Sequence, residues 1–187
     1  MPNIFILAVA LSAVITVFML VFTIMNHAVE KSLYLIPLSV VNLLFAFGNL
    51  LEITAPSLEA AFYGVRVQYI GSPFLLPLLF LFFRDFYGEP RFTWRQHVLL
   101  FTIPTLSAVS LQLFPLVRLQ YGEIWFRTNG QIASVQHTDG TLYLLGIALN
   151  YACMVLSLCL ILRRIHRDRG LRRRQSIVLL AGWILPV

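Results

Sequence analysis

Hydrophobic residues along the chain fall into long blocks that are separated by short polar or basic connections. The blocks cover residues 4–25, 33–55, 60–83, 98–117, 141–162 and 176–187. Each of the first five approaches the roughly 20 apolar residues that a helix needs to cross a bilayer. The last block reaches only about 18 Å as a helix, which is short of the ~30 Å hydrocarbon core. The pattern predicts a single all-α transmembrane domain over 1–187, with five complete helices and a sixth that the chain leaves unfinished.

Composition supports a membrane protein. Of the 187 residues, 59% are hydrophobic and 12% are charged, and the mean hydropathy is +0.82. An ordinary soluble domain carries about twice that share of charged residues. A transmembrane β-barrel would show alternating segments of about ten residues instead of continuous apolar blocks. The net charge of +6 comes from basic residues between the blocks, so we expect contact with anionic lipid headgroups and no nucleic-acid partner.

The basic residues predict an orientation. Lys31 lies in the first connection, three arginines lie between residues 84 and 95, and seven lie between 163 and 174. These alternate connections hold eleven of the fourteen basic residues. The positive-inside rule places such connections in the cytoplasm. We therefore expect the N-terminus and the second and fourth connections to lie outside.

The fourth connection, about 118–140, differs from the others. In YGEIWFRTNGQIASVQHTDG, the pair Asn129-Gly130 stands between two runs of β-forming residues. Asn-Gly is a strong signal for a two-residue hairpin turn. We predict an exterior β-hairpin that packs on the helix ends through Trp125, Phe126 and Ile132. It serves either as a ligand lid or as a simple cap with an aromatic interfacial anchor.

Polar residues gather where the second and third blocks meet. Glu52 ends the second block, and Arg66 lies about two turns inside the third. The connection between them is short, so the two helices are antiparallel neighbours. We predict an ion pair between Glu52 and Arg66, which Gln68, Tyr69 and Asn49 could extend into a polar cluster that binds a ligand or holds the bundle together. In the alternative, the two charges only reach toward the membrane surface.

Pro73 and Pro77 lie four residues apart in the third block. Each removes a backbone donor and favours a bend in the helix. The spacing puts both rings on one face. We expect a bent third helix that helps to shape a cavity, although both prolines could instead serve packing.

Catalytic and metal-binding motifs are not evident in the sequence. The four histidines have no spacing typical of metal ligands, and no phosphate-binding loop or nucleophile motif occurs. His137 in the fourth connection is the histidine to test as a ligand contact. We expect no cofactor and no catalytic residue in these 187 residues, so any enzymatic activity would belong to a part of the protein outside them.

The stretch LLFAFGNLLEITAPSLEAAFYGVRVQYIGSPFLLPLLFLFFRDFYGEPRF resembles the seven-transmembrane N-terminal sensor region of bacterial histidine kinases. The matching residues are an acidic helix end, an R-x-Q-Y-x-G entry and a helix proline: Glu52, Arg66, Gln68, Tyr69, Gly71 and Pro77. The family's Tyr-x-Gly exit appears here as DFYGE, without the intervening residue. The resemblance implies seven helices, an exterior N-terminus in the bacterial cytoplasmic membrane, and a cytoplasmic output module after the seventh helix.

The leading functional hypothesis is therefore a sensory input domain that passes a stimulus to a histidine kinase. The resemblance implies a homodimer and a response regulator reached only through the output module, while the stimulus or small ligand is not specified. Two alternatives are an input domain for a diguanylate cyclase and one half of a small-solute transporter. A transporter would show paired interrupted segments at matching positions, and no such pairs are visible.

Overall fold

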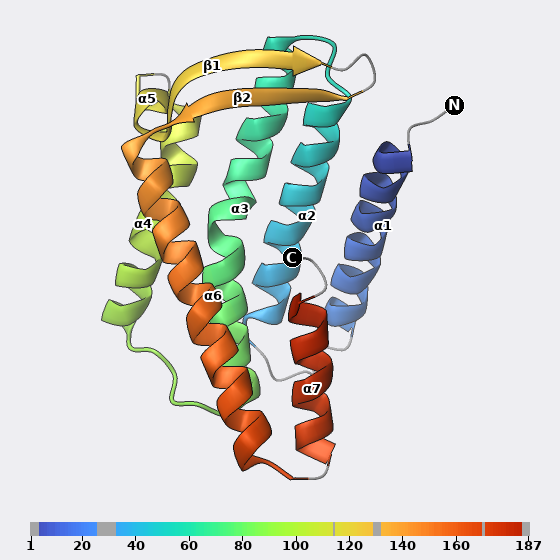
Figure 1. The fold of residues 1–187 in the computed structure, drawn as a ribbon, viewed down its shortest axis with the longest axis vertical. Coiled ribbons are helices and arrows are strands. Elements are labelled where there is room, and N and C mark those ends of the chain that lie inside the picture. The colour runs from blue at the N-terminus through green and yellow to red at the C-terminus, as the bar shows by residue number, and fades with distance from the viewer. Residues whose placement is uncertain (1–3, 26–32, 114, 129–131, 170, 185–187) are drawn as a thin grey trace.

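The computed structural model describes residues 4–25, 33–113, 115–128, 132–169 and 171–184, and is mostly helical (Figure 1). The elements are α1 (Ile4–Met25), α2 (Leu35–Ile53), α3 (Leu58–Phe86), α4 (Trp94–Gln112), α5 (Val117–Gln120), β1 (Tyr121–Thr128), β2 (Ala133–Asp139), α6 (Thr141–Arg167) and α7 (Leu171–Ile184). The two strands form an antiparallel hairpin, as the sequence predicts. Asn129 and Gly130, the predicted turn residues, lie outside the described residues.

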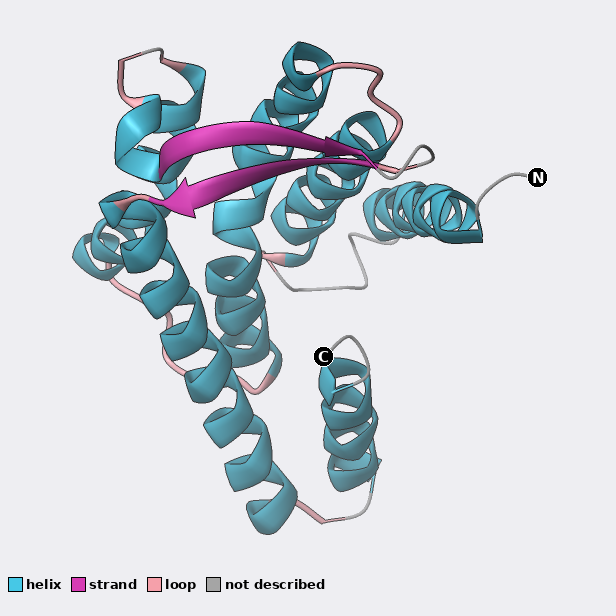
Figure 2. Ribbon diagram, turned by 45° about the horizontal axis from the view of Figure 1, so that its top comes forward, coloured by secondary structure: helices cyan, strands magenta, loops and turns pink. Residues whose placement is uncertain are grey.

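The hairpin lies across one end of the helix bundle, at the same end as the α2–α3 connection (Figures 1 and 2). The α3–α4 and α6–α7 connections lie at the opposite end, as Figure 1 shows. We call these the hairpin end and the basic end. Their separation follows from the length of the helices, since a helix rises 1.5 Å per residue.

Glycines bring α2 and α3 into close contact. A Cβ added at Gly64 of α3 would lie 2.5 Å from the backbone nitrogen of Glu52, and one at Gly48 of α2 would collide with the backbone nitrogen of Gln68. Only residues without a side chain let two helix backbones approach this far. The contact runs along the ridge Gly64, Gln68 and Gly71, so this face of α3 is turned toward α2.

Local signals set the bounds of α3 and α4. Ser57 caps α3 by accepting a hydrogen bond from the Ala60 backbone nitrogen at 3.4 Å. Gly88, just past the end of α3, has φ +67°, which an L side chain rarely adopts. The fourth hydrophobic block was predicted at 98–117, but α4 begins at Trp94 because the Gln96 side chain accepts a hydrogen bond from the Thr93 backbone nitrogen.

The other helices agree closely with the hydrophobic blocks. α1 has the predicted bounds, and α2 lies within 33–55. α3 extends beyond 60–83 at both ends. α6 continues past residue 162 to Arg167, and α7 starts ahead of residue 176, at Leu171. Arginine is a good helix former and is favourable at a helix C-terminus, so the basic run continues α6.

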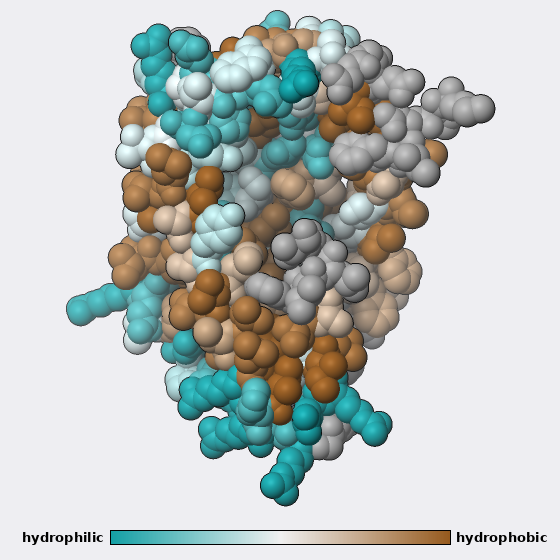
Figure 3. All heavy atoms as spheres, in the orientation of Figure 1, coloured by the Kyte–Doolittle hydropathy of each residue, from teal (hydrophilic) through white to brown (hydrophobic). Residues whose placement is uncertain are grey.

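Four helices in the described part of the chain are long and apolar enough to cross a membrane: Ile6–Met25, Leu35–Ile53, Leu58–Phe86 and Thr141–Arg167. Figure 3 shows hydrophobic residues around the middle of the molecule and hydrophilic residues gathered at both ends. The apolar side chains of α1 are largely exposed in the isolated chain. Such a surface suits a helix that faces lipid.

The hairpin is anchored on a hydrophobic core. Six buried residues form this core at the hairpin end: Ala61, Val65, Leu111, Val117, Tyr121 and Val135. Phe126 and Ile124 pack against it, as predicted for Phe126. Trp125 is 46% exposed and lies on the outer face, where alternation along a strand places it. Of the three predicted anchors, Phe126 is therefore confirmed, Trp125 faces outward, and Ile132 is half-buried but is not part of this core.

Candidate functional site

A polar cavity of about 360 Å³ lies beneath the hairpin. Its walls come from α2, α3, α4, α5, α6 and both strands. The polar lining residues are Glu52, Gln68, Tyr69, Ser72, Ser107, Gln120, Tyr121, His137, Tyr143 and Asn150, and the others are Phe45, Val65, Pro73, Val135, Gly146 and Ile147. Polar groups gathered inside an apolar bundle make this cavity the candidate functional site.

Glu52 ties three elements together at the wall of this cavity. Its Oε2 accepts a hydrogen bond from Gln68 Nε2 at 2.8 Å, which joins α2 to α3. Its Oε1 accepts one from the Val135 backbone nitrogen at 2.9 Å, which holds β2 on the bundle. Hydrogen bonds to a charged acceptor are stronger than neutral ones. The carboxylate thus acts as a clamp that fixes the hairpin over the cavity.

A β-bulge turns Tyr121 toward the cavity. Ile124 pairs with His137 and Tyr121 pairs with Asp139, so two residues of β1 oppose one residue of β2 between these pairs. Side chains alternate between the faces of a strand. The extra residue therefore restores Tyr121 to the inner face, where only 3% of it is exposed.

Aromatic rings form one wall of the site. Tyr121 stacks on His137 with centroids 3.8 Å apart, and it meets Tyr69 edge to face at 5.7 Å. Tyr143 of α6 packs against the His137 ring at 5.0 Å. The Tyr69 phenol hydrogen-bonds with the side chains of Tyr121 and Gln120. Burial raises the pKa of the Tyr121 phenol, so it stays neutral.

His137 is held with an unpaired ring nitrogen. Its Nδ1 is buried without a hydrogen-bond partner and lies 3.6 Å from Asp139 Oδ1, which is beyond hydrogen-bonding distance. Burial lowers the pKa of the imidazole, and this outweighs the neighbouring Asp139 and Glu52 carboxylates, which act in the opposite direction. His137 is therefore neutral at pH 7.

Two further acceptors in the cavity lining are unpaired. Gln120 Oε1 and Asn150 Oδ1 are both buried and have no hydrogen-bond partner in the described structure. Gln120 is only 2% exposed. Because a buried acceptor without a donor is costly, such groups in a cavity are suited to meet a donor from a ligand.

The predicted ion pair between Glu52 and Arg66 is wrong. No ion pair joins them among the described residues, and Arg66 instead lines a separate hollow beside Phe62 and Tyr63. The Arg66 guanidinium lies over the Phe62 ring at 5.0 Å. Two residues along a helix differ by about 200° in direction, so when Gln68 faces Glu52, Arg66 must face away.

The other predicted residues are distributed as follows. Gln68, Tyr69 and His137 line the cavity, and so does Pro73. Asn49 is half-buried and does not line it. Pro73 and Pro77 are both buried inside α3, which continues through them. A bend at these prolines stays a prediction.

Sequence reasoning missed Gln120, Tyr121, Tyr143 and Asn150. Gln120 comes just before the predicted hairpin stretch and Tyr121 begins it, and their inward direction depends on α5 and on the bulge. Asn150 offered the clearest signal, because it is an amide in the middle of an apolar helix. Tyr143 is in the first turn of the same helix and gave no signal of its own.

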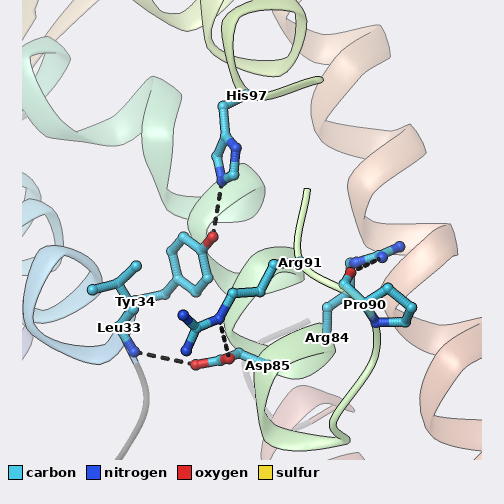
Figure 4. A network of polar contacts seen from close by, with 7 residues as sticks. All are labelled: Leu33, Tyr34, Arg84, Asp85, Pro90, Arg91 and His97. Carbon is cyan, nitrogen blue, oxygen red and sulfur yellow. Dashed lines mark hydrogen bonds and ion pairs between the residues drawn. The ribbon is translucent and has the colours of Figure 1, made fainter. Parts of the chain in front are cut away.

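The basic end carries a second set of polar contacts (Figure 4). The Tyr34 hydroxyl lies 2.8 Å from His97 Nε2, which links the start of α2 to α4. Asp85 accepts a hydrogen bond from the Leu33 backbone nitrogen at 3.1 Å and lies 3.8 Å from Arg91 Nε. These contacts connect α2 and α4 with the end of α3.

The same end also joins α6 and α7 to the α3–α4 connection. Arg164 Nη2 donates to Glu89 Oε1 at 2.8 Å and to the Tyr87 carbonyl oxygen at 2.9 Å. The Tyr87 hydroxyl donates to Ser176 Oγ at 3.1 Å. The end of α3 is therefore in contact with both helices that follow the hairpin.

The chain matches the family described as the N-terminal 7TM region of histidine kinase over residues 8–187. It belongs to this family. The histidine-kinase 7TM region is a membrane sensory input region, which agrees with the apolar helices and the resemblance noted in the sequence. No curated protein and no solved structure matches the chain. In the described part of this 7TM region, no group of three His, Cys, Asp or Glu residues is placed to hold a metal ion.

Proposed function

We propose that this 7TM region detects an exterior stimulus in the cavity beneath the hairpin and relays it to a cytoplasmic kinase module. One observation carries the proposal: Glu52 clamps Val135 of the hairpin over a polar cavity that the helices also line. A ligand that entered this cavity would contact α2, α3, α6 and the hairpin together. It could therefore favour one arrangement of the helices over another.

The proposal includes a topology. The N-terminus and the hairpin lie outside the bacterial cytoplasmic membrane, five helices cross it, and α7 is part of a sixth. The positive-inside rule supports this orientation, since the arginine-rich run 163–174 spans the α6–α7 connection, at the end opposite the hairpin (Figure 1). α4 is counted as a crossing helix although its nineteen residues are less apolar than the other four.

The relay would use the contacts at the basic end. A shift of α3 changes the position of Glu89 and Tyr87, and these residues contact Arg164 and Ser176. In this topology α7 runs outward from the basic end, and a seventh helix would lead back to the output module. In this proposal the full protein acts as a homodimer, and a response regulator receives the signal through the kinase module.

Labelling with a membrane-impermeant maleimide tests the topology. In a variant with Cys153 and Cys159 replaced by Ser, we expect Glu123→Cys to react in intact cells, and Arg169→Cys to react only after permeabilisation. Both positions are exposed. Equal labelling of the two from outside would contradict the proposal.

Autophosphorylation of the full-length protein tests the relay. Glu52→Ala releases the clamp and should change the basal rate, whereas Glu59→Ala, at an exposed position outside the cavity, should not. A normal rate in both variants would contradict the relay.

The kinase output is favoured over a diguanylate cyclase by the family description. A transporter is disfavoured because its sites lie near the membrane midplane, not under an end cap.

A further inference from the structure

We propose that the cavity beneath the hairpin binds a small organic cation with N–H donors, of the primary ammonium class. This inference rests on the proposed sensory function and names the class of stimulus. It is drawn from the charge, the unpaired acceptors and the aromatic wall of the cavity.

The charge of the lining is negative. Glu52 is an acidic lining residue, and none of the described residues that line the cavity is Lys or Arg. His137 adds no positive charge at pH 7 because burial lowers its pKa. Asp139 lies just beyond it, 3.6 Å from the ring. A cation would be favoured here and an anion disfavoured, because electrostatic interactions are stronger where the dielectric is low.

The hydrogen-bonding groups also favour a donor ligand. Gln120 Oε1 and Asn150 Oδ1 are buried acceptors without partners. Each Glu52 oxygen accepts one of the two hydrogen bonds described above, and a carboxylate oxygen can accept a second. A primary ammonium group has three N–H donors, so it could satisfy several of these oxygens together.

The remaining wall suits the organic part of such a ligand. The rings of Tyr69, Tyr121 and Tyr143 border the cavity, and aromatic faces attract cations. The volume of about 360 Å³ falls in the range of small-molecule sites. Val65, Pro73 and Ile147 provide apolar contact for a short alkyl chain.

Isothermal titration calorimetry of the protein in lipid nanodiscs tests the inference with three probes. Butylammonium should bind with a saturable heat. Tetramethylammonium, which has the charge but no N–H, should bind more weakly, and butyrate should not bind. Glu52→Gln should weaken butylammonium binding about tenfold or more, because the amide can still accept from Val135 but no longer carries the charge.

Two variants control the result. Glu59→Gln makes the same change of charge at an exposed position that lines the separate hollow with Arg66, and it should bind butylammonium like wild type. Asn150→Asp adds a carboxylate to the lining and should strengthen binding. Circular dichroism and the melting temperature show whether each variant is folded.

Several outcomes would overturn the inference: butyrate binding as tightly as butylammonium, equal losses in Glu52→Gln and Glu59→Gln, or no saturable heat with any probe. Equal binding of tetramethylammonium would overturn the role of the N–H donors. None of these outcomes would reject the sensory function itself, because the labelling and autophosphorylation tests use no ligand.

Discussion

Arg164 of α6 and Glu89 of the α3–α4 connection form an ion pair with Nη2 and Oε1 2.8 Å apart, and their side chains are only 19% and 24% exposed. Arg164→Ala would leave both Glu89 and the Tyr87 carbonyl without this donor. We expect the free energy of unfolding to fall by about 1 kcal/mol, which is less than the roughly 1.5–3 kcal/mol of a hydrogen bond to a charged group because the pair is partly exposed. Differential scanning fluorimetry in detergent measures this as a lower melting temperature.

Arg163→Ala is the matched control for this prediction. It removes the same charge from the neighbouring, exposed position. If both variants lower the melting temperature equally, the contact with Glu89 does not stabilise the basic end.

The Glu52 clamp gives a second prediction. Glu52→Ala removes the acceptor of the Val135 backbone nitrogen, and we expect the amide of Val135 to exchange hydrogen about tenfold faster or more. Glu52→Gln keeps an acceptor oxygen and should retain most of the protection. Hydrogen exchange measured by mass spectrometry on the hairpin peptides provides the readout.

Arg66→Ala tests whether the Glu52 clamp depends on the ion pair with Arg66 that the sequence predicted. Arg66 faces the other hollow, so its removal should leave the exchange of Val135 unchanged. Faster exchange of Val135 in Arg66→Ala than in wild type would mean that the two charges act together.

The contact between α2 and α3 gives a third prediction. Gly64→Ala would put a Cβ 2.5 Å from the Glu52 backbone nitrogen, which can move only if the helices separate. We expect a loss of about 1–3 kcal/mol in stability, as for other overpacked sites. Gly146→Ala is the control, because its Cβ would be 3.7 Å from Ser107 Oγ, an ordinary contact. Thermal denaturation of both variants compares them, and equal stability would refute the tight packing.

His137 gives a fourth prediction, on pH. Its pKa is lowered in the folded protein, chiefly by burial, so the unfolded chain binds a proton first as pH falls. The stabilising contribution of neutral His137 is therefore fully present above the unfolded value of about 6.5 and decreases as pH falls below it. Melting temperatures between pH 8 and pH 5 should fall more steeply for wild type than for His137→Phe. Identical slopes would contradict the prediction.

The architecture was largely predictable because it follows from hydrophobic block length. Blocks of about 20 apolar residues predict helices regardless of their neighbours, and α1 has the predicted bounds. The hairpin was also predictable, because Asn-Gly between β-forming runs is a local signal. The bounds of α4 were less accurate, since Thr93 and Gln96 form a cap through side chains that hydrophobicity does not report.

The candidate site was only partly predictable. Glu52, Gln68 and Tyr69 were identified as polar residues within apolar blocks, which is a property of the sequence alone. The partner of Glu52 was predicted wrongly as Arg66. The direction of Arg66 depends on which face of α3 meets α2, and the glycines of α3 set that face. Counting positions from Gly64 would have shown that Gln68 shares its face and that Arg66 does not.

The bulge in β1 lets the strand carry one extra residue without changing the direction of Tyr121. Removing one residue between Tyr121 and Ile124 would restore a regular ladder in which the phenol of Tyr121 still faces the cavity, because side chains two positions apart on a strand share a face. Replacing an outward residue such as Trp125 leaves that direction unchanged. The outer face of the hairpin, and the one residue that the bulge adds, can therefore change while Tyr121 remains part of the cavity wall.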